Sequence, residues 1–356
     1  MVYNKSMKNT SYYIERNNKN TIRLRDVLKD LPDFCYDFFT GIENNSSTLT
    51  RLNYAYDLRV FFDYLFNETN VFHGKNIYTL ETVDLANVKT QHIERYLSYL
   101  TTYEDRDGKI RTNTERGKAR KLACVRAFFK YFYKRDLIPY DVSSKVSMPK
   151  LHDKNIIRLE KDEVTKFLDE VENGFGLTGH AKGFHKKTRK RDIAMLTLLL
   201  GTGMRVSECV GLNLADIDFK INGLKVTRKG GNQVVLYFSD EVKMPLVDYI
   251  EERNNNPLLK DEPALFCSLQ NKRITTRAVE NLVKKYAQIV TPLKHITPHK
   301  LRSTYGTALY RETGDIYIVA DVLGHKDVNT TKKHYAAISD DIRKSAATKV
   351  RLRDWF

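Results

Sequence analysis

The chain has 356 residues, of which 41% are hydrophobic, and this is enough for about two domains that each bury a core. Its 60 lysines and arginines exceed its 44 aspartates and glutamates, and the net charge of +16 favours a polyanionic partner such as DNA or RNA, although a soluble basic protein would show the same excess. The four cysteines lack C-x-x-C spacing, no apolar signal region opens the chain, and the longest apolar stretch, residues 193–200, is too short to span a bilayer. The composition therefore argues against a disulfide scaffold, a zinc ribbon and a membrane protein, and it indicates a reducing cytoplasm.

The N-terminal part of the sequence predicts a leader followed by a helical domain. Residues 1–22 are polar and rich in Asn, Lys and Tyr, which is typical of a flexible or partner-docked segment. Residues 23–147 have helical periodicity, and we interpret their aromatic residues as core rather than as platforms for stacked bases. Two apolar faces mark this core: Tyr54, Leu58, Phe61, Phe62 and Leu65 on one helix, and Leu122, Val125, Phe128, Phe129 and Phe132 on another.

Two basic segments are candidate DNA contacts. The segment with the second apolar face also carries cations that suit a reader of phosphates or of the major groove, while a solvated charged face is the alternative. A second basic run precedes the apolar stretch, and we expect it in a loop that contacts phosphate; a nuclear localisation signal is the other interpretation. Between the two segments, residues 148–157 are polar and predict a linker that lets two domains close around a duplex. The cations are Arg111, Arg116, Lys118, Arg120, Lys121 and Arg126, and then Lys186, Lys187, Arg189, Lys190 and Arg191.

Arg205 follows an apolar helix that two glycines interrupt. The pattern predicts a helix, a tight turn at Gly201 and Gly203, and a second helix that presents Arg205 at its start. Glu208 can stabilise the first turn of that second helix and can also hold the Arg205 guanidinium. A glycine-rich turn between two core helices is the plainer interpretation. No G-x-x-x-x-G-K-[ST] or G-x-G-x-x-G motif supports a nucleotide-binding loop.

Lys229 and the pair His299 and Arg302 come next along the chain. Lys229 lies in a glycine turn between two β-rich runs, which predicts a hairpin with the lysine near its tip; a solvated lysine is the alternative. Pro298 predicts a helix start, and the spacing of three places His299 and Arg302 on one helix face. His295 and His299 are four residues apart, but Pro298 between them and the lack of a third ligand argue against a metal site.

Tyr335 is the only tyrosine after His325, and this position distinguishes it from the rest of the 21 tyrosines. The tail over residues 336–356 predicts a helix from about residue 340 that ends in Trp355 and Phe356. An aromatic pair at the end of a chain is expected to dock, either on the same chain or on a neighbouring protomer.

Taken in order, these polar residues suit phosphodiester chemistry. Arginines can donate paired hydrogen bonds to the non-bridging oxygens of a phosphate, a lysine can protonate a leaving alkoxide, and a tyrosine can attack phosphorus. No metal and no nucleotide cofactor is needed for such a reaction. The set consists of Arg205, Glu208, Lys229, His299, Arg302, His325 and Tyr335.

The order and contexts of these residues resemble the tyrosine recombinase (phage integrase) family over roughly residues 160–340. More loosely, residues 112–132 resemble the core-binding domain of the Xer-type members (XerC, XerD and XerS). The matching motifs are Gly-Thr-Gly-Met-Arg-Val-Ser-Glu at 201–208, the Lys229 hairpin, His-Lys-Leu-Arg at 299–302, Leu-Gly-His at 323–325, and Tyr335.

The resemblance implies a mainly α fold with a small β-sheet in the catalytic domain. A helical, SAM-like core-binding domain (23–147) and a catalytic domain (158–356) would form a C-shaped clamp on DNA. It also implies that the enzyme cleaves and rejoins double-stranded DNA at paired sites through a Holliday junction, as a homotetramer whose tails dock between protomers. The reaction would serve DNA integration and excision or chromosome dimer resolution, at the nucleoid of a bacterial or archaeal cytoplasm.

Roles for single residues also follow from the resemblance. Tyr335 would be the nucleophile that forms a 3′-phosphotyrosyl bond, and Lys229 would be the general acid for the 5′ oxygen. The phosphate would be bound by Arg205 and Arg302, with help from His299 and His325 at the phosphate or in proton transfer, and Glu208 would orient the site.

Two departures from the family pattern stand beside this resemblance. The spacing from His325 to Tyr335 is one residue longer than the commonest Xer pattern, and Ser303 stands where many members have a second histidine. Three alternatives to a recombinase are a non-catalytic DNA-binding regulator on the same scaffold, a type IB topoisomerase-like enzyme that relaxes DNA, and a metal-dependent phosphohydrolase.

Overall fold

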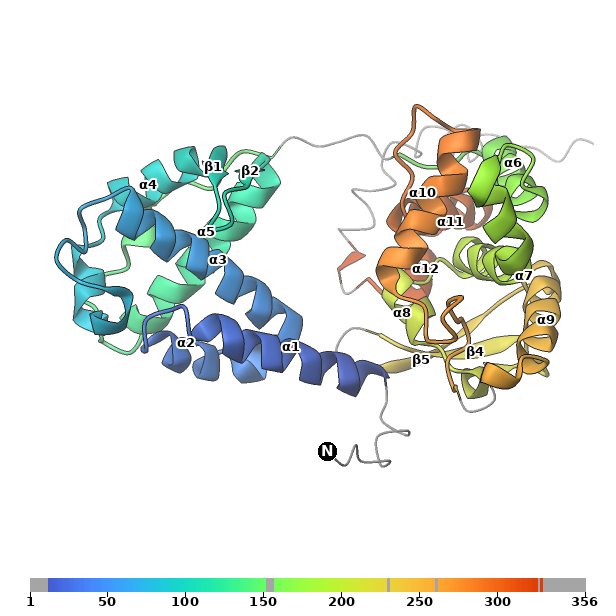
Figure 1. The fold of residues 1–356 in the computed structure, drawn as a ribbon, viewed down its shortest axis with the longest axis horizontal. Coiled ribbons are helices and arrows are strands. Elements are labelled where there is room, and N and C mark those ends of the chain that lie inside the picture. Colours follow the sequence, from blue (N-terminus) through green and yellow to red (C-terminus); the bar gives the residue numbers. More distant parts are fainter. Residues whose placement is uncertain (1–11, 152–156, 229–230, 260–261, 326, 329–356) are drawn as a thin grey trace, which may run out of the picture. The chain divides into compact units, whose positions relative to one another are not determined.

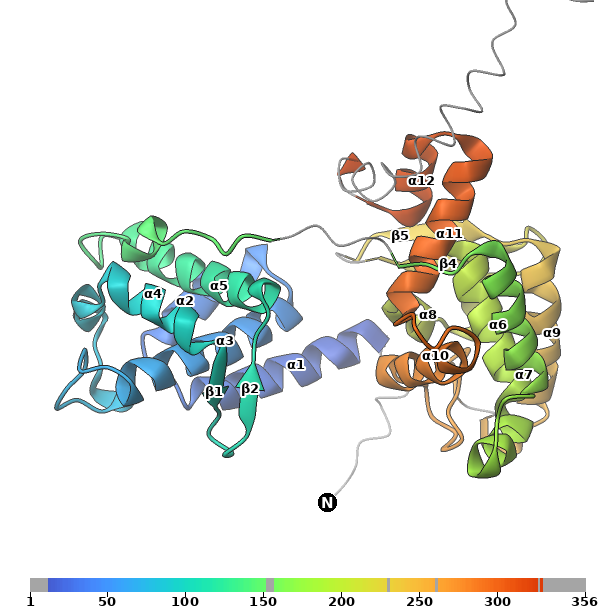
Figure 2. The same cartoon turned by 90° about the horizontal axis from the view of Figure 1, so that it is seen from above.

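The computed structural model describes residues 12–151, 157–228, 231–259, 262–325 and 327–328. The chain divides into two compact units, residues 1–153 and 154–356, and this boundary lies within the segment 148–157. Both units are mostly helical and each contains a small antiparallel sheet (Figure 1, Figure 2). The expected fold class is thus confirmed. None of the described helices is both long enough and apolar enough to cross a membrane.

Helices and one short hairpin make up the first unit. The hairpin consists of β1 (Thr102–Glu104) and β2 (Ile110–Thr112), with Tyr103 opposite Arg111, and it interrupts the helical pattern expected over this region. The helices are α1 (Tyr12–Leu28), α2 (Cys35–Gly41), α3 (Thr48–Asn67), α4 (Thr90–Tyr99) and α5 (Glu115–Tyr133).

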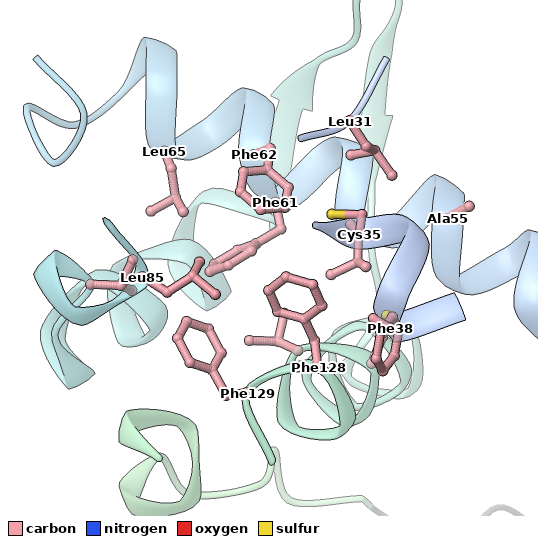
Figure 3. Packing of buried hydrophobic residues seen from close by; sticks show 14 of the residues in the cluster. Leu31, Cys35, Phe38, Ala55, Phe61, Phe62, Leu65, Leu85, Phe128 and Phe129 are labelled. Carbon is pink, nitrogen blue, oxygen red and sulfur yellow. The ribbon is translucent and has the colours of Figure 1, made fainter. Parts of the chain in front are cut away.

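Aromatic side chains fill the core of the first unit (Figure 3). Phe61 and Phe62 of α3 meet Phe128 and Phe129 of α5, and Phe38 of α2 packs edge-on against Phe128 with 5.3 Å between ring centroids. Each buried phenylalanine contributes about 1.5–3 kcal/mol through removal of its apolar surface from water. The two apolar faces recognised in the sequence therefore form one core, in which the aromatic residues are packed as predicted.

The expected leader is partly helical. Helix α1 begins at Tyr12, so the prediction of a flexible segment over residues 1–22 is wrong for its second half, and residues 1–11 lie outside the described residues. The helix is anchored because Leu24, Val27 and Leu28 are buried in the core. A polar composition concealed an amphipathic helix whose buried positions gather near its C-terminal end.

The second unit combines a helical body with a three-stranded sheet of order β3-β4-β5 (Figure 1). Strands β4 and β5 are antiparallel, with Val226 opposite Val234, which is the hairpin predicted around Lys229. The strands are β3 (Ile217–Asp218), β4 (Gly223–Thr227) and β5 (Gln233–Tyr237). The helices are α6 (Lys161–Asn173), α7 (Gly179–Thr202), α8 (Val206–Gly211), α9 (Asp240–Asn254), α10 (Thr276–Val290), α11 (Pro298–Thr313) and α12 (Ile316–Leu323).

Helix α7 is the central element of the second unit and packs against α6, α9 and α11. Its C-terminal half is apolar and buried, and its N-terminal half contains the basic run 186–191. The prediction that this run forms a loop is therefore wrong. Lysine and arginine favour helices, and no proline interrupts the segment, so the helix continues until Gly203 ends it.

Asp57 is expected to be a main determinant of the stability of the first unit. Its carboxylate is 2% exposed, accepts a hydrogen bond from Lys121 Nζ at 2.9 Å and also pairs with Arg120, so it ties α3 to α5. An Asp57→Ala change leaves the Lys121 ammonium buried without its partner and should destabilise the unit by about 3–5 kcal/mol. Hydrogen–deuterium exchange of α3 and α5 in the full-length protein should accelerate accordingly.

Asp26→Ala is the matched control for Asp57→Ala. Asp26 pairs with Lys29 on the surface, where both side chains are largely exposed, and solvent screens such a pair. Exchange in α3 and α5 should stay unchanged in this variant. Equal exchange in both variants would contradict a structural role for the buried Asp57.

Candidate active site

Arg205 is presented where α7 ends and α8 begins. Gly203 ends α7 in the left-handed conformation (φ 62°), and a Cβ there would overlap Tyr305 and Leu323. The chain then extends through Arg205, which is the N-cap residue of α8. The predicted helix, glycine turn and restarted helix are therefore present, although Gly201 belongs to α7 and Gly203 alone makes the turn.

Glu208 fixes the Arg205 side chain from one turn further along α8. Its carboxylate accepts a hydrogen bond from Arg205 Nη1 at 2.8 Å and a second from the Arg205 backbone N–H, also at 2.8 Å. The Glu208 side chain is 3% exposed, whereas that of Arg205 is 35% exposed. A buried carboxylate thus orients a guanidinium that solvent, or a phosphate, can still reach.

Arg302 and His299 lie on α11, which begins at Pro298 as predicted, with Thr297 as its N-cap. Arg302 is 7% exposed; its Nη1 donates to the Gly203 carbonyl at 2.9 Å and its Nη2 donates to the Leu323 carbonyl. It therefore joins the end of α7 to the end of α12. His299 is exposed, one turn before Arg302, and lines a cavity of about 470 Å³ together with His295 and Val206.

Arg228 approaches the same place from the sheet. It follows the last residue of β4, and its side chain donates to the Asp321 carbonyl at 3.3 Å and to the Val322 carbonyl at 2.7 Å. Burial is the main cause of a lowered pKa of its guanidinium; nearby Glu208 opposes this effect and Arg205 adds to it. Sequence reasoning missed Arg228, and the signal that could have found it is its position directly before Lys229.

The arginines converge on the C-terminal end of α12, which lies beside α11 (Figure 2). Arg228 binds the carbonyls of residues 321 and 322, Arg302 binds that of residue 323, and Arg205 Nη2 donates to that of Gly324 at 3.2 Å. These carbonyls lie at the C-terminal end of the helix, which is the negative end of its dipole, so cations are stabilised there. The Asp321 carbonyl also accepts a hydrogen bond from the Gly324 N–H at 2.8 Å. The result is a concentration of positive charge held in place by backbone oxygens.

His325 continues directly from this helix end. Its backbone N–H donates to the Ala320 carbonyl at 2.9 Å, after Gly324 turns the chain in the left-handed conformation (φ 62°). The structure thus brings Arg205, Arg302 and His325 together around residues 320–325. Lys229 and Tyr335 lie outside the described residues. Among the described residues, no three His, Cys, Asp or Glu side chains gather as a metal site requires.

The proposed DNA contacts fall into two groups. Several of these cations are held within the protein: Lys121 is buried on Asp57, Arg126 donates to the carbonyls of Ser143 and Val146, and Arg191 pairs with Asp192 and donates to the Cys267 carbonyl. These three side chains thus bind groups of the protein itself, and Lys118, which pairs with Glu115, has a largely covered side chain. Largely exposed side chains belong to Arg111 on β2, to Arg116 and Arg120 on α5, and to Lys186, Lys187 and Arg189 on α7, while Lys190 is half-buried.

Comparison with known proteins identifies the class. The phage integrase family matches residues 157–341, which is more than half of the chain. The chain belongs to the phage integrase family, as the sequence motifs indicated.

Its curated relatives include tyrosine recombinases of bacteria. XerC of Caldanaerobacter subterraneus subsp. tengcongensis is 31% identical over 328 residues, which cover 88% of this chain and 84% of the relative. XerS of Streptococcus thermophilus is 31% identical over 339 residues, which cover 87% and 93%. These alignments extend well beyond the second unit, so the similarity includes much of the first.

Solved structures share the fold. The XerH site-specific recombinase in its post-cleavage complex with palindromic difH substrate superposes with a TM-score of 0.63 at 19% identity, covering 85% of this chain and 80% of that one. A lambda integrase dimer bound to a COC′ core site superposes with a TM-score of 0.59 at 15% identity, covering 91% of this chain and 96% of that one.

Proposed function

We infer that this protein is a site-specific DNA recombinase, an enzyme that breaks and rejoins DNA strands. Its relatives are named tyrosine recombinases at about 30% identity over most of both chains. The observation that carries the inference is the meeting of Arg205, Arg302 and His325 at one end of α12 in a chain of this family. Double-stranded DNA is the corresponding partner, and the net charge of +16 favours it.

The proposed reaction conserves the energy of the phosphodiester. The Tyr335 hydroxyl gives up its proton, to a histidine of the site or to water, and its oxygen forms a bond to phosphorus. The bond from phosphorus to the 5′ oxygen breaks, and Lys229 gives the leaving oxygen a proton. The product is a 3′-phosphotyrosyl bond and a free 5′-hydroxyl. A 5′-hydroxyl from another strand reverses the step, so rejoining through a Holliday junction needs no ATP.

Arg205 and Arg302 are proposed to bind the non-bridging oxygens of the phosphate. A phenol with a reference pKa of about 10 is a poor nucleophile, so electrostatic stabilisation of the transition state must supply much of the rate. Fixed guanidinium groups suit this task because they need no reorganisation during the reaction. His299 and His325 are assigned to the phosphate or to proton transfer, and Glu208 holds Arg205 in orientation.

Assembly and DNA contacts complete the proposal. We assign the first unit to binding of the core DNA site and the second unit to catalysis. We further propose that four protomers assemble on two DNA sites and that their C-terminal tails dock between protomers. The mass of the complex on DNA with two sites would show whether four protomers are present. The exposed cations on β2, α5 and α7 contact phosphates, and each one removed should lower the salt dependence of binding by about one charge. The proposed place of action is the nucleoid of a bacterial or archaeal cytoplasm, which chromatin immunoprecipitation would detect.

The decisive test is a covalent adduct with DNA. Genomic fragments that the purified protein enriches would be nicked near the centre of the bound site, so that the 5′ product diffuses away and cleavage cannot reverse. We expect an SDS-resistant adduct in the presence of a chelator, mapped to Tyr335 and absent in Tyr335→Phe. Tight binding to several sites without any adduct would instead favour a non-catalytic regulator. Relaxation of supercoils without exchange between two sites would favour a topoisomerase.

A further inference from the structure

The backbone of Arg228 forms hydrogen bonds across the β4–β5 hairpin, and its side chain extends away from the hairpin to α12. Its N–H donates to the Asn232 carbonyl at 2.8 Å, and its own carbonyl accepts from the Gly231 N–H at 3.0 Å. The guanidinium reaches the end of α12, where it donates to the carbonyls of Asp321 and Val322. One residue thus joins the end of β4 to the end of a helix more than 90 positions later in the sequence.

The contact between Arg228 and the helix end is closely packed. Gly324 has no Cβ, and a Cβ at that position would overlap the Arg228 guanidinium. The Nε atom of Arg228 is buried and has no hydrogen-bond partner among the described residues. The side chain therefore packs against the backbone of residues 321–324, and an alanine at this position would lose both of its hydrogen bonds.

We propose that Arg228 is a positioning residue that holds the Lys229 turn in register with the end of α12. Lys229 is the next residue in the sequence, so the position of Arg228 sets where Lys229 is attached. On the other side of the contact, His325 follows Gly324. Lys229, assigned as the general acid, therefore follows one partner of the contact between Arg228 and the end of α12. His325, assigned to the phosphate or to proton transfer, follows the other. This inference rests on the proposed function, in which Lys229 protonates the leaving oxygen.

A contact of this kind is useful because a general acid must be placed accurately beside the oxygen that it protonates. An error of about 1 Å in placing a reacting group can cost on the order of 10²-fold in rate. The backbone hydrogen bonds of Arg228 join it to Gly231 and Asn232 and do not set its distance from α12. The Arg228 side chain supplies that distance.

The test separates positioning of the general acid from a general structural role. One nicked substrate carries the ordinary 5′ oxygen at the scissile phosphate, and a second carries sulfur at that bridging position. When sulfur leaves, the bond from Tyr335 to phosphorus forms, the bond from phosphorus to sulfur breaks, and the thiolate departs without a proton because thiols are far more acidic than alcohols (about 8.5 for the pKa of the cysteine thiol). A variant that lacks a well-placed general acid should therefore recover on the sulfur substrate.

We expect Arg228→Ala to cleave the ordinary substrate on the order of 10²-fold more slowly and the sulfur substrate within a few-fold of the unmodified protein. Lys229→Ala should show the same recovery. Lys225→Ala, which removes an exposed lysine from the same strand, should behave like the unmodified protein on both substrates. Arg228→Lys keeps the positive charge but lacks the guanidinium that donates to two carbonyls at once. Its defect in cleavage of the ordinary substrate should be smaller, and it should also recover on the sulfur substrate. It replaces Arg228→Ala if that variant does not fold.

Three results would overturn the inference. Normal cleavage of the ordinary substrate by both Arg228 variants would show that the tie is not needed. Equal impairment of the Arg228 variants on both substrates, with Lys229→Ala rescued, would reject positioning of the general acid and leave the proposed function intact. Failure of sulfur to rescue Lys229→Ala would remove the general-acid role itself, and the inference with it.

Discussion

An Arg205→Ala variant is expected to bind recombination-site DNA nearly as tightly as the unmodified protein and to cleave it about 10²–10³ times more slowly. The binding energy of DNA is spread over many phosphate contacts, so the loss of one is tolerated. The transition state, in contrast, loses a fixed donor to its developing charge, which is worth about 3–4 kcal/mol in comparable oxyanion sites. Gel-shift titration and adduct formation on the nicked substrate measure the two effects separately.

Two further variants make the Arg205 result specific. Arg205→Lys retains the positive charge but loses the paired N–H groups that bind Glu208 and Gly324, so it should remain strongly impaired. Lys166→Ala removes an exposed cation of the same unit, on α6, and should leave cleavage unchanged. Equal cleavage by Arg205→Ala and the unmodified protein would exclude the proposed role.

Arg302→Ala is expected to abolish cleavage and also to loosen the end of α12. Arg302 is buried and supplies hydrogen bonds to the carbonyls of Gly203 and Leu323, so its removal leaves buried acceptors without donors at about 1–3 kcal/mol each. Arg205 is more exposed, and its replacement should disturb the fold less. Exchange of the amides of residues 319–324 should therefore accelerate in Arg302→Ala and change little in Arg205→Ala.

The comparison of these two variants distinguishes chemistry from support. A loss of cleavage in Arg302→Lys with normal exchange in α12 would point to the phosphate, because the lysine keeps a cation near the same carbonyls. Full cleavage by Arg302→Lys together with rapid exchange would instead assign Arg302 to holding the helix end and remove it from the phosphate.

Local sequence patterns predicted the parts of the site that local geometry determines. Glu208 lies three residues after Arg205, and this spacing on one turn of helix brings the carboxylate to the guanidinium. Pro298 marked the start of α11 in the same way, because proline fits the first turn. Two β-rich runs around a glycine turn predicted the β4–β5 hairpin.

Contacts between distant segments could not be predicted from the same patterns. The acceptors of Arg228 are backbone carbonyls more than 90 residues later, and a carbonyl is present at every position, so no residue type announces the pairing. Lys121 was expected on a charged surface because its neighbours are basic, but Asp57 of α3 draws it into the core. Periodicity shows which face of a helix is apolar; it does not show which polar residue a distant carboxylate will bury.

The acceptors at the end of α12 belong to the main chain, and this determines where the sequence is free to vary. Replacing the side chain of Asp321 or Val322 leaves the carbonyl that Arg228 binds in place. Gly324 has no such freedom, because its backbone is left-handed and because a Cβ there would overlap the guanidinium. Sequence changes in residues 321–324 should therefore preserve function as long as they preserve the path of the backbone, whatever side chains they introduce at positions 321 and 322.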